Sequence, residues 1–207
     1  SCEASLTSVA DTTPPVLFAV AIACSPATPA PIIKNFAGVI VPAAVIIIGT
    51  ALLSIACYQR NIRLVYISTD YVFSGEQGMY AESDAVLPQN KYAWSKLGGE
   101  AALQMLDNYV IIRLSFGPDT FPYKAAFTDQ FTSRESASVI SEKIKNIVLS
   151  DFKGLIHIGA DRKSVYDYAL SLGAENIEKI SIKDMSVKMP KDTSLNTNLY
   201  KSLFNEL

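Results

Sequence analysis

Two ionisable side chains, Tyr92 and Lys96, stand four residues apart in the segment KYAWSK, and a Ser68-Thr69 pair precedes them. Residues at this spacing lie on the same face of an α-helix, one turn apart. A nearby ammonium group favours the phenolate and lowers the pKa of a phenol from its usual value of about 10. We therefore expect Tyr92 to exchange a proton with a substrate carbonyl that a Ser68 or Thr69 hydroxyl holds in place.

The segments around these residues predict the elements that would position them. The run LVYIS, residues 64–68, is short and continuously apolar, as in a parallel strand that is buried on both faces. Asn90 is a suitable N-cap for a helix over residues 91–107. Apolar residues recur at helical spacing in that helix, at Ala93, Leu97, Ala101 and Met105. Ligands of parallel sheets bind beyond the carboxyl ends of the strands, which is where the Ser68-Thr69 pair stands.

Strand-like and helix-like runs alternate along the rest of the chain. We expect strands at VIIRL, residues 110–114, and at LIHIG, residues 155–159. Helices are expected at 137–149 and at 164–173, the second ended by Gly173. This alternation predicts an α/β fold with a mainly parallel sheet. His157, in the middle of a strand, is expected to pack in the core.

Composition excludes several classes of function. The 207 residues carry a net charge of −2 without a clustered basic face, which argues against nucleic-acid binding. The three cysteines have neither metal-binding nor disulfide spacing, so we expect no metal site and a cytoplasmic location. The uncharged run 36–57 could span a bilayer, but Pro42 and Gly49 interrupt it. We expect it to form a buried strand, a loop and a buried helix, with no membrane contact.

The strings LVYISTDYVFSG and YAWSKLGGE closely resemble the extended short-chain dehydrogenase/reductases, and within them the dTDP-4-dehydrorhamnose reductase group. The segments IIRLSFGP, DQFTSRE, GLIHIG and PKDTSLNTNLYKSL resemble later landmarks of that group, in the same order. The resemblance covers roughly residues 47–207. It implies a Rossmann-like, doubly wound sheet with a small C-terminal substrate lobe. Residues 1–118 would form the NAD(P)-binding domain and residues 119–207 the substrate-binding portion.

The same resemblance implies reduction of a nucleotide-linked 4-keto-6-deoxy sugar by NADPH or NADH. Its catalytic triad falls on Thr69, Tyr92 and Lys96. Cofactor-binding positions would be Asn35, Ala37, Ser68, Tyr92 and Lys96. Substrate-binding positions would be Tyr71, Phe73, Arg113 and Arg134. The family resemblance also leaves a homodimer open.

One departure from the family leaves alternatives open. The family begins with a strand and a G-x-x-G-x-x-G turn that brings backbone N–H groups to the cofactor pyrophosphate. This sequence has no such turn, and its nearest candidate, SPATPAP at residues 25–31, contains no glycine. A non-catalytic sugar-nucleotide-binding or regulatory subunit therefore stands beside the reductase, and an epimerase or dehydratase of the same superfamily is a third alternative.

Overall fold

The protein is seen here as a computed structural model that describes residues 37–205, with side chains from residue 43 onward. Its centre is a three-stranded sheet in the order β1-β2-β7. The strands are β1 (Leu64–Thr69), β2 (Tyr109–Leu114) and β7 (Gly154–Ile158), and both pairings are parallel. The three strands expected from the sequence are confirmed, and so is the α/β class. The predicted turn candidate at residues 25–31 and Asn35 lie outside the described residues.

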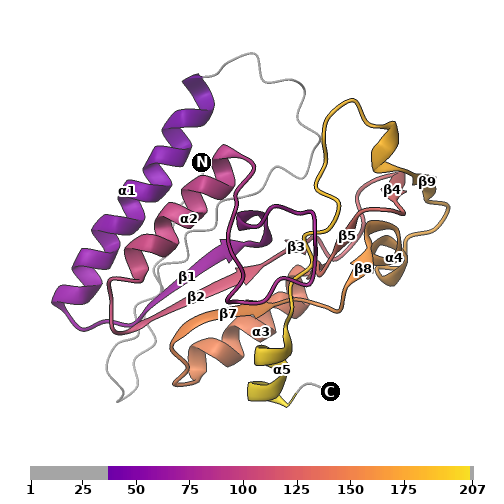
Figure 1. Cartoon of the computed structure of the whole chain (residues 1–207). Helices are drawn as coiled ribbons and strands as arrows, with labels where there is room; N and C mark the ends of the chain where they lie inside the picture. The colour runs from indigo at the N-terminus through magenta and orange to yellow at the C-terminus, as the bar shows by residue number, and fades with distance from the viewer. Residues whose placement is uncertain (1–36, 206–207) are drawn as a thin grey trace.

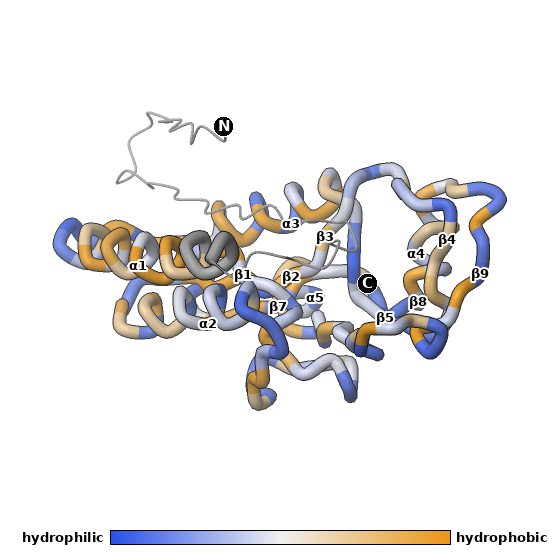
Figure 2. Tube along the Cα trace, turned by 90° about the horizontal axis from the view of Figure 1, so that it is seen from above, coloured by the Kyte–Doolittle hydropathy of each residue, from blue (hydrophilic) through white to orange (hydrophobic). Residues whose placement is uncertain are grey.

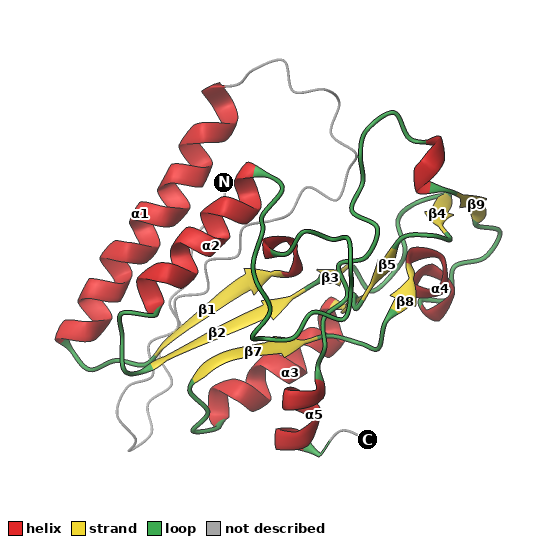
Figure 3. Ribbon diagram, viewed as in Figure 1, coloured by secondary structure: helices red, strands yellow, loops and turns green. Residues whose placement is uncertain are grey.

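Helices cover both faces of this sheet. Helices α1 (Ala37–Gln59) and α2 (Lys91–Leu103) lie side by side on one face, while α3 (Ala137–Leu149) and α5 (Asn198–Phe204) lie on the other, as Figures 1 and 3 show. The strands alternate between two cores because successive side chains point to opposite faces. On the α3 face the buried core contains Val65, Val110, Ile112, Leu114, Ile140, Ile147, Ile156, Ile158 and Tyr200. On the α1–α2 face it contains Cys57, Leu64, Tyr66, Leu103, Leu106 and Ile111.

Helix α1 corrects one expectation. Residues 37–59 form a single helix that packs along α2, instead of a strand, a loop and a helix. Its buried positions include Thr50, Ser54 and Cys57, and the tube of α1 in Figure 2 is mostly coloured as hydrophobic. Four of its apolar side chains are more than half exposed: Val45, Ile48, Leu52 and Ile55. Within the described residues, no helix combines the length and the apolar character that crossing a bilayer requires.

Helix α2 begins as the sequence predicted but buries a different face. The Asn90 side chain accepts a hydrogen bond from the Ala93 amide (2.8 Å), which confirms the N-cap. The helix ends at Leu103, and Met105 is 77% exposed. The expected apolar face is therefore wrong in its last two turns. The buried positions are Ala93, Ser95, Lys96, Gly99, Glu100 and Leu103, so charged residues face the sheet.

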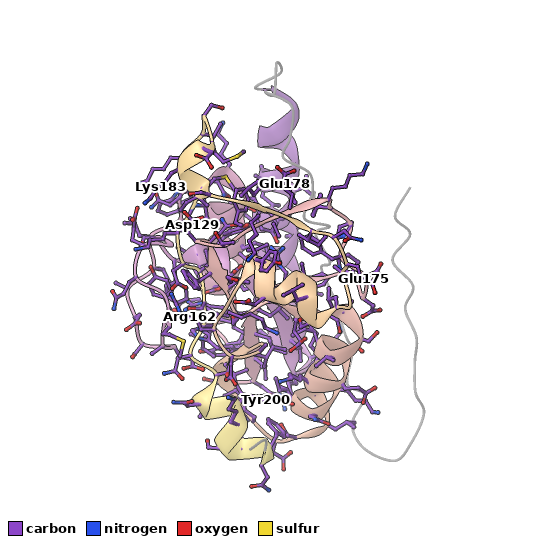
Figure 4. All side chains as sticks on the ribbon, turned by 90° about the vertical axis from the view of Figure 1, so that its right-hand side faces the viewer. Asp129, Arg162, Glu175, Glu178, Lys183 and Tyr200 are labelled. Atoms are coloured by element: carbon purple, nitrogen blue, oxygen red, sulfur yellow. The ribbon has the colours of Figure 1, made fainter. Side chains whose placement is uncertain are left out.

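Three two-stranded sheets extend the molecule beyond the carboxyl ends of the main strands. They pair β3 (Phe116–Gly117) with β6 (Glu135–Ser136), β4 (Ala125–Phe127) with β9 (Glu178–Ile180), and β5 (Phe131–Thr132) with β8 (Lys163–Ser164). The short helices here are α4 (Val165–Ser171) and the 3-10 turn η2 (Ile182–Asp184). Asp129 lies beside Lys183 in Figure 4 and accepts the Ile182 amide at 2.9 Å. The division at residue 118 stays a prediction.

The chain returns from this region to the end of β1. The Asp192 amide donates to the Gly75 carbonyl (2.7 Å), and the Thr193 hydroxyl donates to Asp70 (2.7 Å). Residues more than a hundred positions apart in the sequence thus lie together at the edge where parallel sheets bind ligands.

Candidate active site

The end of β1 turns directly into a short 3-10 helix, η1 (Asp70–Val72), that Thr69 caps. The Thr69 hydroxyl accepts from the Tyr71 amide (3.2 Å) and donates to Asp70 (3.1 Å). Thr69 is 6% exposed, and it stands at the carboxyl edge of the sheet as the sequence predicted. Its one hydroxyl proton is already donated to Asp70, so a hydrogen bond to a substrate carbonyl oxygen would require that bond to break.

Asp70 is a buried carboxyl group that the sequence argument did not include in the site. It is 3% exposed and accepts hydrogen bonds from the hydroxyls of Thr69 and Thr193. Burial raises the pKa of Asp70, while the Thr193 hydrogen bond and the positive charge of Arg134 act in the opposite direction. Asp70 therefore links the end of β1 to the returning chain at Thr193 and to the cation of Arg134.

Tyr92 stands in the first turn of α2 and is half-buried. Burial, together with the nearby Asp70 and Tyr71, raises the pKa of its phenol to about 12. The sequence argument expected Lys96 to lower this pKa, and that expectation is wrong for this arrangement. The phenol is therefore protonated at neutral pH and is suited to donate a proton.

Lys96 is 2% exposed and contacts a different tyrosine. Its ammonium lies 4.3 Å from the ring centre of Tyr66, on β1. Burial lowers the pKa of Lys96 to about 8, and the charge of Glu100 acts to raise it. The Tyr66 phenol donates to the Lys96 carbonyl (3.2 Å) and is influenced electrostatically by Tyr92. Tyr66 thus lies close to both predicted catalytic residues of α2.

Glu100 completes a buried polar network under α2. Arg113 donates to both of its carboxylate oxygens, from Nε (3.0 Å) and from Nη2 (2.7 Å). The Ser68 hydroxyl donates to the same carboxylate. Glu100 is fully buried, and Ser68 and Arg113 are 3% and 4% exposed. The structure therefore places Ser68 and Arg113, predicted for cofactor and substrate, in an internal network, and their ligand contacts stay predictions.

Two predicted substrate residues, Tyr71 and Arg134, do lie together. Burial and the charge of Asp70 raise the pKa of Tyr71, while the charge of Arg134 and a hydrogen bond from it lower that pKa. Arg134 also donates to the Ser115 hydroxyl (3.4 Å). Both side chains are half-buried, so they border the site from η1 and from the segment between β5 and β6.

Phe73 and His157 lie inside the molecule. Phe73 is 1% exposed, stacks on Tyr80 with ring centres 4.3 Å apart, and meets the edge of His157. His157 is fully buried, as predicted for a core residue. The burial of Phe73 gives no support to its predicted role as a wall of the substrate site. Ala37 begins α1, and its side chain lies outside the described residues.

One pattern in the sequence, the spacing of Lys96 and Glu100, indicates part of the site that was not predicted. Glu100 follows Lys96 by four residues, which places it on the same helix face. Two glycines stand between them, and Gly99 is buried directly against the Tyr66 hydroxyl. A helix that places Gly99 against a strand is bound to turn Lys96 and Glu100 inward as well. Asp70 and Thr193 left no comparable pattern because their contact spans the chain.

The family profile described as RmlD substrate binding domain matches residues 42–146, just over half of the chain. The chain belongs to this family. The matched part contains most of α1 and all of β1, α2 and β2, and so it includes Thr69, Tyr92, Lys96 and the Glu100–Arg113 pair. This is a family of reductases that act on sugar nucleotides, and the resemblance read from the sequence is confirmed at that level.

Curated relatives of this RmlD-family chain match mainly in short stretches. It is 44% identical over 71 residues to a dTDP-4-keto-6-deoxy-D-glucose reductase of Streptomyces niveus, covering 33% of this chain and 25% of the relative. It is 27% identical over 177 residues to the dTDP-4-dehydrorhamnose reductase of Escherichia coli K12, covering 68% and 59%. A stretch of 37 residues is 60% identical to methionine adenosyltransferase 2 subunit beta of Danio rerio, covering 18% and 12%. The chain therefore spans less than two thirds of the length of these relatives.

Solved structures place this RmlD-family chain in the expected fold. The dTDP-4-dehydrorhamnose reductase of Clostridium acetobutylicum superposes with a TM-score of 0.69 at 24% identity, covering 81% of this chain and 68% of that one. The Bacillus anthracis dTDP-4-dehydrorhamnose reductase in complex with NADP superposes with a TM-score of 0.65 at 23% identity, covering 77% and 64%. MoeE5 in complex with UDP-glucose and NAD gives 0.60 at 16% identity, covering 77% and 64%. These likenesses show the fold.

Proposed function

We propose that this protein reduces a nucleotide-linked 4-keto-6-deoxy sugar with NADPH or NADH, in the manner of a dTDP-4-dehydrorhamnose reductase. The observation that carries the proposal is the position of Tyr92. Its protonated phenol stands at the carboxyl edge of a parallel sheet, close to Asp70 and Tyr71, in a chain of a sugar-nucleotide reductase family. A reduced carbonyl gains a hydride on carbon and a proton on oxygen, and Tyr92 is the group placed to give that proton.

The neighbouring residues would divide the remaining tasks. Thr69 would hold the carbonyl oxygen after exchanging one of its present partners. Lys96 would supply positive charge one helical turn from Tyr92. Arg134 carries a planar guanidinium that suits the phosphates of a nucleotide, and Tyr71 lies against it. The cytoplasmic location and the homodimer expected from the sequence remain parts of this proposal.

The described residues fit only one end of a nicotinamide cofactor. Tyr92 and Lys96 supply the phenol and the ammonium that the nicotinamide end would contact, and the cofactor itself supplies the hydride. The printed sequence offers no G-x-x-G-x-x-G turn for the pyrophosphate. Cofactor affinity measured on this chain would therefore show whether another arrangement of backbone N–H groups serves the pyrophosphate.

The test is loss of reduced-nicotinamide absorbance with a dTDP-4-keto-6-deoxy sugar. Tyr92→Phe should lower turnover by roughly 10²- to 10⁴-fold, because it deletes the proton donor and keeps the ring. Tyr58→Phe is the matched control, since Tyr58 is 66% exposed on α1 and should react as the unmodified protein does. Lys96→Ala should weaken turnover and cofactor binding together. Equal turnover of Tyr92→Phe and Tyr58→Phe would refute the assignment.

A second function is favoured by one observation, the 37-residue stretch shared with methionine adenosyltransferase 2 subunit beta. We infer from it the alternative of a non-catalytic sugar-nucleotide-binding or regulatory subunit. That alternative predicts binding of nucleotide sugars without any oxidation of NADPH or NADH. It also predicts that Tyr92→Phe leaves activation of a partner enzyme unchanged.

A further inference from the structure

The buried face of α2 carries two opposite charges one turn apart. Lys96 is 2% exposed and Glu100 is fully buried, and both lie in the same stripe as Ala93 and Leu103. An isolated charge in a protein interior is costly unless a partner compensates it. The buried charges of Lys96 and Glu100 therefore require compensating groups on the elements that pack against α2.

The carboxylate of Glu100 is held by three elements at once. It projects from α2 and receives two hydrogen bonds from Arg113 on β2 and one from Ser68 on β1. Arg113 approaches with a planar fork, the geometry that fixes a carboxylate most firmly. Ser68 is the residue immediately before Thr69. The network thus ties α2, which carries Tyr92 and Lys96, to the strand end that carries Thr69.

Two cations, Arg113 and Lys96, lie beneath α2 with one anion, Glu100. The Arg113–Glu100 pair is neutral, so the charge of Lys96 has no anion of its own in this network. Arg113 forms the direct ion pair with Glu100, and the Lys96 ammonium lies over the Tyr66 ring on β1. The Tyr66 phenol is in turn influenced electrostatically by Tyr92, and Asp70 of η1 acts on Tyr92. Burial favours the neutral amine of Lys96, and the charge of Glu100 opposes that effect. Removing Glu100 would leave two buried cations without an anion beneath α2.

We propose that Glu100, fixed by Arg113 and Ser68, is a positioning residue that keeps Lys96 in its charged form and holds α2 in register with the end of β1. The role of Lys96 in catalysis rests on the proposed function, whereas the control of its charge by Glu100 does not. Arg113 belongs to the same network, because its two hydrogen bonds hold the Glu100 carboxylate in place. A merely structural ion pair would stabilise the fold without setting the protonation of Lys96.

The test is the pKa of the Lys96 amine, measured by NMR on the full chain labelled with ¹³C-lysine, with Lys96→Met to assign the signal. Glu100→Gln should lower this pKa by about one pH unit or more, because an opposite charge at close range shifts a pKa by roughly 1–3 units. Arg113→Gln should raise it, because it removes a like charge and leaves Glu100 to Lys96. Asp161→Asn is the control, since Asp161 is exposed, pairs with Lys201 of α5 and should leave the Lys96 pKa unchanged.

Opposite shifts in the two variants support the proposal, and no shift in either, or shifts of the same sign, overturn it. If Glu100→Gln does not fold, the direction of the Arg113→Gln shift decides. If neither variant folds, the Lys96 pKa of the unmodified protein decides. Buried lysines without a compensating charge have pKa values of about 5–6, so a Lys96 pKa below about 6 would overturn the proposal. If the proposed reduction holds, Glu100→Gln should also move the alkaline limit of turnover to lower pH. An absence of turnover would refute that function and leave the NMR result intact.

Discussion

Acid should destabilise this protein through His157, the only histidine in the sequence. The ring is fully buried, its Nδ1 lies 3.1 Å from the Tyr80 carbonyl, and the edge of the ring meets Phe73. Burial, together with the positive charge of Arg113, lowers the pKa of His157 to about 3. The native state therefore keeps the ring neutral across the pH range in which an unfolded histidine becomes charged.

The magnitude follows from the two pKa values. An unfolded histidine has a pKa of about 6.5, so below that pH the unfolded chain binds a proton that the native state does not bind. Native stability from this group is therefore fully present above about pH 6.5 and is lost as the pH falls towards the native pKa of about 3. At about 1.4 kcal/mol per pH unit, lowering the pH from about 7 to about 5 should remove about 2 kcal/mol.

The assay is urea unfolding at these two pH values for the unmodified protein and for His157→Gln, whose amide keeps a donor for Tyr80. Carboxyl groups contribute equally to both proteins, so the difference between their losses isolates the histidine. The unmodified protein should lose about 2 kcal/mol more than the variant. Equal losses would mean that His157 is charged in the native state, and the burial argument would then be refuted.

Three further predictions concern the elements that hold the site. Asn90→Ala should lower the free energy of unfolding by about 1 kcal/mol in urea titrations, because it removes the N-cap of α2, whereas the neighbouring exposed Gln89→Ala should have little effect. Gly99→Ala should lower the thermal midpoint more than Gly98→Ala, because a Cβ at Gly99 would overlap the Tyr66 hydroxyl while one at Gly98 meets Cγ1 of the exposed Ile47 side chain at 3.0 Å; equal midpoints would contradict this packing. Arg63→Lys should cost about 1–3 kcal/mol, because Arg63 donates to four carbonyls at the end of α3, and Arg60→Lys, with one exposed contact, is the control.

The sequence predicted the strands well because their apolar runs are local signals. LVYIS, VIIRL and LIHIG are each short and mostly apolar, and this pattern is typical of parallel strands buried on both faces. The N-cap at Asn90 and the helix end at Gly173 were equally local. Helix α1 was harder to predict, because a mostly apolar run without charged residues has no clear helical or strand period to read.

The site was predicted only in part, because its electrostatics depend on contacts between distant segments. The spacing of Tyr92 and Lys96 placed both on α2, but it did not show that the Lys96 ammonium lies over Tyr66. The expected lowering of the Tyr92 pKa was wrong because burial, Asp70 and Tyr71 all raise it. The pairing of Glu100 with Arg113 required the register between α2 and β2, which no local pattern contains.

We propose that a reduced nicotinamide cofactor bound to this chain delivers a hydride to the carbonyl carbon of a 4-keto sugar while Tyr92 protonates the oxygen. Deuterium transfer tests it most directly: NADPH or NADH deuterated at the transferable position is incubated with dTDP-4-keto-6-deoxyglucose or its epimer, and the product is analysed by NMR. The account predicts deuterium on the C4 carbon of the sugar, with the signal lost in Tyr92→Phe and kept in Tyr58→Phe. A product without deuterium at C4, or deuterium transfer that Tyr92→Phe leaves undiminished, would contradict it.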